Sequence, residues 1–302
     1  MTHHQLICIA GPTASGKTAI ALKRAKAIGA WVISADSRMV FQGLDIGTGK
    51  PTWEYRQLPH SPWQTPLREE LWGPVYRITG VDHHLLDVVA PETPWTLADW
   101  LKRVDQIRIA ADKAKRPLIV VGGTGLYLKA LLFGYQLPPT DPAVRHRLEA
   151  METRAISEAL QKVDPVTAAR EQANRRRLIR ALEVYLLTGQ PHAVPRTKPR
   201  PEIDLMIVAR PRAELLARID ERINDRLKSG MIEEVENLIM HVVSHAWLHQ
   251  LGLEYRVITN WLTSEKKERS ELVAQLRQVI HAYARRQETF LRTQFTGITR
   301  ST

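Results

Sequence analysis

The sequence is poor in cysteine and in long apolar segments. Among 302 residues it has one cysteine, Cys8, which excludes an internal disulfide and indicates a reducing compartment such as the cytoplasm. No apolar run approaches the roughly 18 residues that a membrane span needs, so we expect no membrane partner. Hydrophobic residues make up 44% and charged residues 25% of the chain, which is ordinary for a globular protein and excludes fibrous and wholly disordered classes.

Acidic residues are outnumbered: 43 basic and 32 acidic side chains give a net charge of +11. Residues 170–200 contain eight basic and two acidic side chains, so this segment carries more than half of the excess. A solvated helix face normally mixes its signs, whereas clustered arginine and lysine usually contact phosphate. The pattern favours a polyanionic partner, with a basic surface that serves only solubility as the alternative.

Short apolar runs alternate with helical stretches in the first half of the chain. The apolar runs are residues 6–10, 31–34 and 118–121, and the clearest helical stretches are 17–28 and 96–115. Continuous apolar strands that alternate with helices predict a parallel sheet covered on both faces.

Residues 52–78 interrupt this pattern with tryptophans set among prolines. This composition predicts a loop-like insertion whose aromatic residues pack it down locally. Base stacking on the tryptophans is the alternative interpretation.

The second half of the chain reads as helical. Asp141-Pro142 is typical of a helix start, and a later helix ends at Gly189, with Arg176 and Arg180 on one side of it. Residues 191–201 contain four prolines and read as a linker. Further helices are expected at residues 212–229, 231–242 and 270–293.

Residues 11–18 match the phosphate-binding pattern G-x-x-x-x-G-K-[ST] in full. The pattern lies between an apolar strand and a helix, which is the context that it requires. Backbone N–H groups and the helix N-terminus then face one anion, Lys17 adds a full charge and the Thr18 hydroxyl can hold Mg²⁺. The predicted diphosphate-binding residues of this loop are Gly11, Pro12, Thr13, Ala14, Ser15, Gly16, Lys17 and Thr18.

A carboxylate follows the early strand rather than the later one. The later strand ends at Gly122-Gly123, without the acid that orients metal and water in many NTPases, whereas Asp36 closes residues 31–34. Because the carboxyl ends of parallel strands face one crevice, Asp36 is expected beside the phosphate loop. This arrangement favours group transfer over hydrolysis; a helix cap is the alternative role for Asp36.

Nine stretches together resemble the bacterial tRNA dimethylallyltransferases, also called tRNA isopentenyltransferases. The phosphate loop alone is generic, but its combination with ISADS and VGGTGLYL is specific, and the similarity spans nearly the whole chain. The stretches are GPTASGKT (11–18), ISADSR (33–38), GLDIGTGKP (43–51), DHHLLDV (82–88), VGGTGLYLKALL (121–132), LPPTDPAVR (137–145), NRRRLIRALEVYLLTG (174–189), SGMIEEV (229–235) and AYARRQETFLR (282–292).

The resemblance implies an α/β fold with a P-loop NTPase-like parallel sheet core and an inserted all-helical domain. The core is expected at residues 1–138, the tRNA-binding insertion at 139–195, and the return to the core with C-terminal helices at 196–302. The implied reaction moves a dimethylallyl group from dimethylallyl diphosphate to the N6 amine of adenosine 37, beside the anticodon, in tRNAs that read codons beginning with U. The cofactor is Mg²⁺, the partner is the tRNA anticodon stem-loop, and the family precedent is a monomer.

The resemblance, together with position, also assigns roles to residues. Asp36 is the expected base, because an exocyclic amine is a poor nucleophile that must lose a proton as the bond forms. Thr13, Thr124 and Arg222 join it as catalytic candidates, Arg218 joins the diphosphate-binding residues, and Thr18 is the metal ligand. The expected tRNA-binding residues are Asp36, Ser37, Arg38, Met39, Arg145, Arg176, Arg177, Arg180, Arg256 and Arg285.

Three places depart from the family pattern. Residue 39 is methionine where many members have glutamine, and the stretch 52–78 is longer than usual. Residues 252–256 replace a more compact Gly-Tyr-Arg/Lys pattern, so the sequence leaves open which of these residues makes the tRNA contact of that pattern.

Two other features of the sequence have alternative interpretations. Arg218 and Arg222 can serve as ion-pair partners of nearby acids, and His83-His84 favours packing over metal binding because no partner has zinc-site spacing.

Three other functions compete with tRNA prenylation: prenylation of free adenine nucleotide, a P-loop small-molecule kinase, and an RNA-binding module that uses nucleotide as a switch. The first two alternatives act on small substrates, which would not need the arginine-rich segment. The absence of a carboxylate at the end of the later strand argues against the nucleotide-dependent switch. We expect Arg176 and Arg180 to act on binding, so that replacing both with alanine flattens the salt dependence of tRNA affinity.

Overall fold

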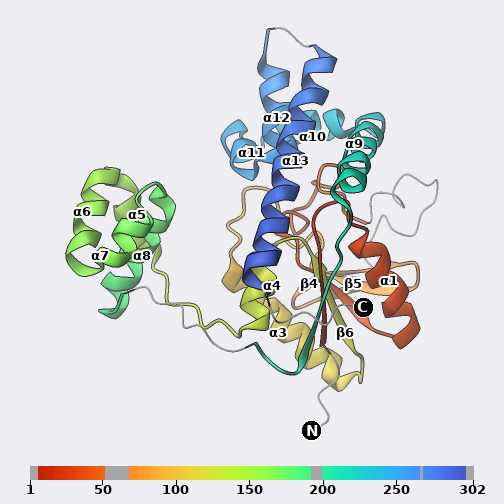
Figure 1. Ribbon diagram of the computed structural model, residues 1–302, viewed down its shortest axis with the longest axis horizontal. Helices are drawn as coiled ribbons and strands as arrows, with labels where there is room; N and C mark the ends of the chain where they lie inside the picture. Colours follow the sequence, from red (N-terminus) through yellow and green to blue (C-terminus); the bar gives the residue numbers. More distant parts are fainter. Residues whose placement is uncertain (1–5, 52–67, 192–198, 266–267, 297–302) are drawn as a thin grey trace. The chain divides into compact units, whose positions relative to one another are not determined.

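The computed structural model describes residues 6–51, 68–191, 199–265 and 268–296. The chain divides into two compact units, which Figure 1 draws in full. One unit comprises Met1–Leu132 with Pro199–Thr302, and the other comprises Phe133–Lys198. We call the first the sheet unit and the second the helical unit.

The sheet unit is built on a seven-stranded sheet of order β3-β4-β5-β2-β6-β1-β7 among the described residues. From β5 to β7 all neighbours are parallel, whereas β4 runs antiparallel to β3 and β5. The expected α/β fold with a parallel core is therefore confirmed. The strands are β1 Leu6–Ala10, β2 Trp31–Ser34, β3 Arg68–Glu70, β4 Gly73–Ile78, β5 Val81–His84, β6 Leu118–Gly122 and β7 Ile203–Ile207.

Every residue of β1 and of β6 is buried, because helices cover both faces of the sheet. α1 (Lys17–Ile28) packs Ala21 and Ala25 against alternate strand residues such as Ile7 and Ile9. α3 (Leu97–Lys113) begins at a capping box formed by Thr96 and Asp99. α4 is Gly125–Leu132. The Cys8 thiol is buried in β1, and burial raises its pKa to about 12.

The C-terminal helices form a second hydrophobic core, with which Val40, Phe41 and Leu44 also pack. Figure 1 shows these helices gathered at one end of the sheet. Three of them follow the expected ranges closely, while the two short helices α11 and α12 were not expected from sequence. The five are α9 Arg212–Lys228, α10 Met231–Met240, α11 His245–Leu251, α12 Leu253–Thr263 and α13 Arg269–Gln294.

The helical unit packs four helices around a small apolar core that includes Leu148, Ile156, Leu160, Leu178 and Leu182. The helix start that Asp141-Pro142 indicated is in place. Asp141 accepts from the N–H groups of the first turn, and Pro142 stands at the first helical position. The helices are α5 Pro142–Ala150, α6 Thr153–Val163, α7 Pro165–Arg170 and α8 Arg175–Thr188.

The interpretation of residues 52–78 as a loop-like insertion is wrong for its second part. Residues 68–78 form the antiparallel pair β3 and β4, in which Val75 and Tyr76 are buried and Trp72 packs against His84. Pro74 masked this strand pattern, because it stands at the second position of β4, near a strand start, where a sheet tolerates proline. Residues 52–67 lie outside the described residues. In the described part of the chain, no helix combines the length and apolar character that crossing a bilayer requires.

Candidate active site

The phosphate loop joins β1 to α1 and has the conformation that an anion cradle needs. Gly16 caps α1 at a φ of +88°, and Ala14 also has a positive φ of 62°. Gly11 has no room for a side chain, since a Cβ there would lie 2.6 Å from Ser15 Oγ and 2.9 Å from the carbonyl oxygen of Val208. Lys17 turns back over the loop and donates to the Pro12 carbonyl oxygen at 3.2 Å. The loop therefore presents its ammonium group next to its own backbone.

Arginines on α9 and just before it donate hydrogen bonds to the phosphate loop. Arg210 donates to the carbonyl oxygen of Ser15 at 2.7 Å, and Arg218 donates to that of Ala14 at 2.9 Å. Arg222 donates to the hydroxyl of Thr13. Burial, together with the nearby Arg226, lowers the pKa of Arg222. This concentration of positive charge suits a group that develops negative charge.

The alternative role of Arg218 and Arg222, as ion-pair partners of neighbouring acids, does not fit these contacts. Both bond the phosphate loop instead. The Asp220 carboxylate lies 2.8 Å from His281 and 3.7 Å from Arg277 on α13. Sequence reasoning identified Arg218 and Arg222 but missed Arg210, whose position just before α9 carried no signal.

Asp36 lies where the order of the strands predicts. It shares a small hollow with Thr13, Lys17, Arg38 and Tyr283. One Asp36 oxygen accepts from the backbone N–H of Arg38 at 2.9 Å, so this carboxylate does cap a local turn, although no helix follows it. The structure thus brings the expected base and the phosphate loop to one place.

Lys17 lines two neighbouring hollows. The first is the hollow of Asp36, and the second is lined by Thr18, Arg218, Arg222 and residues of α9. Burial, reinforced by Arg222, lowers the pKa of Lys17 to about 8. A cation that is buried near other cations gains free energy when an anion arrives. The position therefore suits a diphosphate between the two hollows.

Thr124 connects the end of β6 to the segment that carries Asp36. Its backbone N–H donates to the carbonyl oxygen of Ala35 at 3.1 Å, and its hydroxyl accepts from the N–H of Ser37 at 3.1 Å. Gly122 makes this approach feasible, because a Cβ there would lie 2.1 Å from the Ala35 oxygen. Thr124 thus contacts the residues on either side of Asp36.

The comparisons with known proteins agree with this geometry. Residues 74–294 match the family described as "IPP transferase", and residues 4–58 match that described as "Isopentenyl transferase". A tRNA dimethylallyltransferase of Thermomicrobium roseum is 36% identical over 296 residues, covering 95% of this chain and 83% of the relative. The chain belongs to the IPP transferase family. The resemblance seen in the sequence is thereby confirmed.

Other relatives extend this membership of the IPP transferase family. A tRNA dimethylallyltransferase of Moorella thermoacetica is 36% identical over 303 residues, covering 96% of this chain and 88% of that one. The crystal structure of a tRNA isopentenylpyrophosphate transferase from Bacillus halodurans aligns with a TM-score of 0.65 at 28% identity, covering 99% and 89% of the two chains. A eukaryotic dimethylallyltransferase, solved acting on tRNA, shares the fold with a TM-score of 0.78 at 19% identity, covering 99% and 73%.

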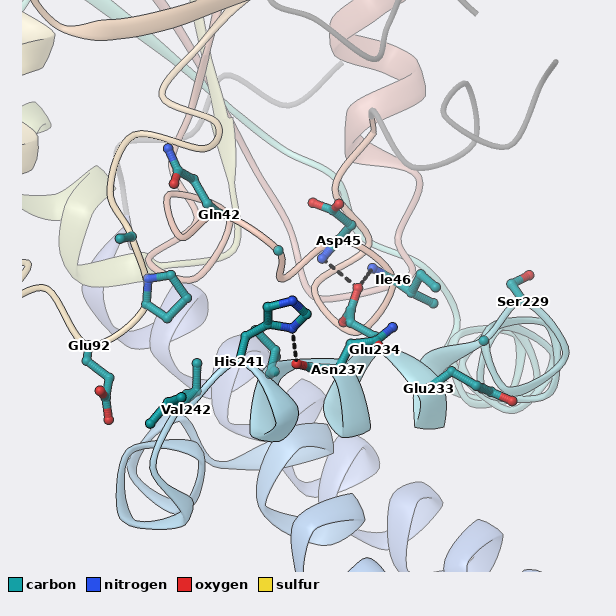
Figure 2. A pocket seen from close by; sticks show the side chains of 16 residues that line it. Gln42, Asp45, Ile46, Glu92, Ser229, Glu233, Glu234, Asn237, His241 and Val242 are labelled. Carbon is teal, nitrogen blue, oxygen red and sulfur yellow. Dashed lines mark hydrogen bonds between the residues drawn. The ribbon is translucent and has the colours of Figure 1, made fainter. Parts of the chain in front are cut away.

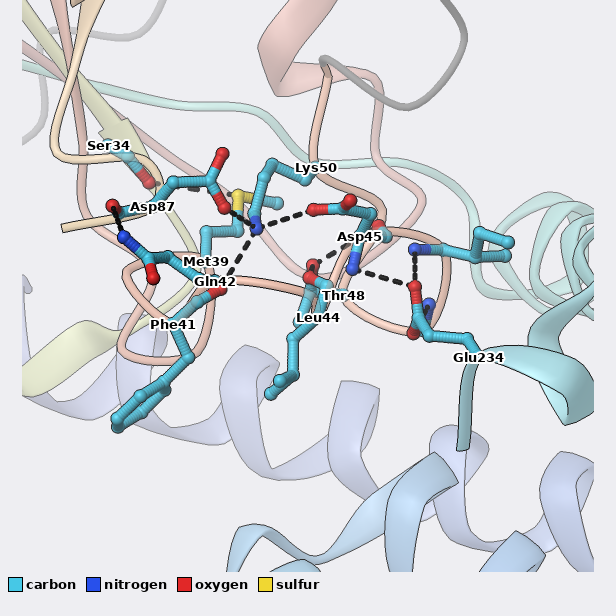
Figure 3. A network of polar contacts seen from close by, with 12 residues as sticks. Ser34, Met39, Phe41, Gln42, Leu44, Asp45, Thr48, Lys50, Asp87 and Glu234 are labelled. Carbon is cyan, nitrogen blue, oxygen red and sulfur yellow. Dashed lines mark hydrogen bonds and ion pairs between the residues drawn. The ribbon is translucent and has the colours of Figure 1, made fainter. Parts of the chain in front are cut away.

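The family stretch 43–51 is held by two charged side chains, Glu234 and Lys50, that the sequence analysis did not single out (Figure 3). The Glu234 carboxylate accepts the backbone N–H groups of Asp45, Ile46 and Gly47 at 2.8, 2.6 and 3.0 Å. Lys50 is fully buried, and its ammonium lies 2.6 Å from Asp45 and 2.5 Å from Asp87. Glu234 and Lys50 lie in the stretches 229–235 and 43–51, which resemble the family. This resemblance was the one signal in the sequence that could have pointed to them.

Residues 252–256 contribute a buried carboxylate, Glu254, which lies in the hollow of Asp36 and pairs with arginines from other segments. Arg38 donates to Glu254 at 3.0 Å, and Arg226 donates to the Gly47 carbonyl oxygen at 2.9 Å. Burial alone would raise the pKa of Glu254, but Arg38 and Arg226 outweigh it and lower this pKa. Glu254 and Tyr255 are buried while Arg256 is exposed. Of the three, Arg256 is therefore the side chain that solvent can reach.

A wide hollow between α10 and the loops at 42–46 and 90–92 contains no residue expected to act in the chemistry (Figure 2). Its lining is acidic, with Glu92 and Glu233 at the surface. Glu92 accepts from Ser244. An acidic lining repels phosphate, so this hollow is not an alternative site for the diphosphate.

The expected tRNA-binding residues of the sheet unit differ in how accessible they are. Arg285 is exposed on α13. Met39 instead packs against the cluster of Tyr76, Ile78 and Leu86, and Ser34 donates to its sulfur at 3.7 Å.

His83 and His84 are buried, Trp72 donates to His84 at 3.0 Å, and burial lowers the pKa of His83 to about 4. Among the described residues no group of three or more potential metal ligands occurs.

The arginines of the helical unit also divide into two kinds. Arg176 is exposed, and Arg177 is exposed and pairs with Glu171 at 3.2 Å. Arg180 donates to the carbonyl oxygens of residues 138 and 139 at 2.7 and 3.0 Å, and to Glu183 at 2.7 Å. Arg145 also donates to Glu183. Arg145 and Arg180 therefore stabilise the unit, whatever they contribute to RNA binding.

Glu183→Gln should lower the stability of the helical unit by about 2 kcal/mol, since it leaves two arginines without their shared carboxylate. The effect is below that of a fully buried pair, because the arginines are 27% and 23% exposed. Burial alone would raise the pKa of Glu183, but bonds from Arg145 and Arg180 outweigh it and lower this pKa. The stabilisation is therefore present above the ordinary value of 4.5 and is lost as the pH falls through the folded value.

Hydrogen exchange of the helical unit, followed by mass spectrometry in the full chain at neutral pH, measures this effect. Exchange should accelerate in Glu183→Gln and stay unchanged in Glu149→Gln, which alters an exposed carboxylate of the same unit. Circular dichroism should show the difference between wild type and Glu183→Gln shrinking in acid. Equal exchange in both variants would exclude Glu183 as a stabilising residue.

Proposed function

We propose that the protein transfers a dimethylallyl group from dimethylallyl diphosphate to the N6 amine of adenosine 37, next to the anticodon, in tRNAs that read codons beginning with U. The products are N6-(dimethylallyl)adenosine and diphosphate, and the protein acts as a monomer. The observation that carries this proposal is the hollow shared by Asp36, Thr13 and Lys17. A carboxylate beside a phosphate loop suits transfer to an acceptor that must lose a proton.

The proton and the leaving group go to different residues of this site. The N6 lone pair forms the new bond to the allylic carbon while the bond from that carbon to the diphosphate oxygen breaks. Asp36 takes the N6 proton, and the diphosphate departs towards Lys17, Arg218 and Arg222. Preorganised donors of this kind meet developing charge without reorganisation. Because a stacked adenine cannot reach a carboxylate inside a small hollow, the nucleotide must be flipped out of the anticodon loop.

Mg²⁺ fits the same picture as the partner of the diphosphate. The Thr18 side chain lines the second hollow together with the carboxylates of Glu221 and Asp225. Oxygen donors are the ligands that Mg²⁺ prefers, and it commonly binds through few protein groups plus substrate phosphates. We assign Thr18 as the protein ligand. When bound, the ion neutralises charge on the leaving diphosphate.

The helical unit is the proposed binding site for the anticodon stem-loop. Its exposed Arg176 and Arg177 are suited to phosphate contacts, which set affinity and its salt dependence. In the sheet unit, the proposed tRNA contacts are Ser37, Arg38, Arg256 and Arg285, whereas Met39 packs against the local core.

Arg176→Ala should weaken tRNA binding and reduce the slope of log affinity against log salt by about 1, because one phosphate contact is lost. The melting temperature should not change, since the side chain is exposed. Arg180→Ala should lower the stability of the helical unit as well. Filter binding over a salt series measures the slope, with the exposed Lys113→Ala on α3 as the control. An unchanged slope in Arg176→Ala would remove this residue from the phosphate contacts.

The decisive experiment incubates the protein with unmodified tRNA, dimethylallyl diphosphate and Mg²⁺, and analyses the nucleosides by mass. A gain of one dimethylallyl group on adenosine supports the proposal. AMP in place of tRNA tests prenylation of free nucleotide, and ATP in place of the allylic donor tests a kinase. Product only in either of these arms would replace the proposal by that alternative.

A further inference from the structure

The reaction needs a fixed distance between two groups that lie on different loops. The diphosphate is held by the loop that follows β1, while Asp36 follows β2. In the sheet, β6 lies between these two strands. The loops extend beyond the strands, so the register of the sheet does not by itself fix how far apart they stand.

Gln287 of α13 bonds the loop after β1 and the segment after β6 with its one amide group. Its Oε1 accepts from the backbone N–H of Thr13 at 2.8 Å, and its Nε2 donates to the carbonyl oxygen of Gly123 at 2.9 Å. The residue is 7% exposed and lines the hollow of Asp36. A Cβ on Gly123 would lie 2.3 Å from Gln287 Nε2, so the contact is also close. A side-chain amide can accept from an N–H with its oxygen and donate to a C=O with its nitrogen at the same time.

The hydrogen bonds continue from β6 to Asp36. Thr124, next to Gly123, donates its N–H to Ala35 and accepts from the N–H of Ser37, each at 3.1 Å. Asp36 lies between these two residues. The series of contacts therefore runs from the phosphate loop through Gln287 and the end of β6 to the segment of the base, across the carboxyl ends of three neighbouring strands.

We propose that Gln287 is a positioning residue that sets the distance between the diphosphate cradle and the Asp36 carboxylate. The inference rests on the proposed function. Because the Thr13 N–H is bonded to Gln287, the group that Thr13 offers to the donor is its hydroxyl, which Arg222 contacts. Gln287 thus acts on the alignment of the reacting groups rather than on the binding of either substrate.

Gln287→Met tests this inference, because it keeps the volume and removes both hydrogen bonds. The single-turnover rate should fall by about 10²-fold, the loss that a misplacement of about 1 Å produces. The Kd for inorganic diphosphate and the Kd for tRNA should stay within about threefold, since every other contact of the cradle is intact. Gln287→Asn retains an amide that reaches one loop at a time, and should lose about tenfold. Gln275→Met, at an exposed glutamine of the same helix, should match the wild type.

Three results would overturn the proposal. A rate within threefold of the wild type in Gln287→Met would show that the contact does not align the groups. A rate loss matched by an equal loss of diphosphate binding would show that Gln287 shapes the cradle itself. If Gln287→Met does not fold, as judged by circular dichroism, a normal rate in Gln287→Asn overturns it. A wild-type protein that transfers nothing to tRNA would instead refute the proposed function, and the inference with it.

Discussion

Asp36→Asn should lower the rate of dimethylallyl transfer by about 10³-fold and leave tRNA affinity within about threefold. The amide cannot take the N6 proton, and general-base catalysis is commonly worth 10²- to 10⁴-fold. Its oxygen still accepts from the Arg38 N–H, which Asp36 accepts at 2.9 Å, so the local turn is retained. The measurements are a single-turnover assay with labelled donor and filter binding of tRNA.

The control for this variant is Asp112→Asn, which makes the same chemical change at an exposed position of α3. It should retain the wild-type rate. A near-normal rate in Asp36→Asn would refute its assignment as the base, and a parallel loss of tRNA affinity would mean that the carboxylate mainly serves RNA binding.

Lys17→Met should lower kcat/KM for dimethylallyl diphosphate by a few hundredfold, close to the loss of about 3–4 kcal/mol that removal of one preorganised donor causes. Lys17 is the group that lines both hollows of the site, and its ammonium faces the phosphate loop. Its removal therefore weakens the donor complex and the stabilisation of the leaving diphosphate together. Steady-state kinetics at varied donor concentration measure the change.

The same lysine predicts a pH dependence. Burial and the neighbouring Arg222 lower the pKa of Lys17 to about 8 in the free protein, so the ammonium is charged below this pH and neutral above it. Donor affinity should fall by up to about tenfold per pH unit above about 8. The fall should persist in Lys23→Met, at an exposed position of α1, and disappear in Lys17→Met. A pH-independent wild type would show that binding does not need the charged form.

Local patterns predicted the centre of the site because each carries its own physical reason. The spacing of Gly11, Gly16 and Lys17 specifies a phosphate loop, and the apolar strand before Asp36 places that carboxylate at the carboxyl edge of a parallel sheet. The capped helices of the helical unit were also readable, since Asp141-Pro142 and Gly189 mark helix ends. These features need only residues that are close in sequence.

Residues that act across long distances in sequence could not be predicted in this way. Gln287 bonds Thr13, which lies 274 positions away, and Glu234 bonds the segment at Asp45 from 189 positions away. No spacing rule connects such pairs, because the tertiary fold alone brings them together. The family resemblance marked their stretches without assigning them a task. The hairpin of β3 and β4 was missed for a different reason, since its strands are short and bounded by proline and glycine.

The burial of Cys8 makes this chain convenient for site-selective labelling. The sequence has no second cysteine, and burial in β1 raises the thiol pKa to about 12. Maleimides react with the thiolate, which is scarce at such a position near neutral pH. The substitution Leu186→Cys, at an exposed position, would therefore let the helical unit alone carry a fluorophore, and would test whether RNA docks there while the natural thiol stays in place.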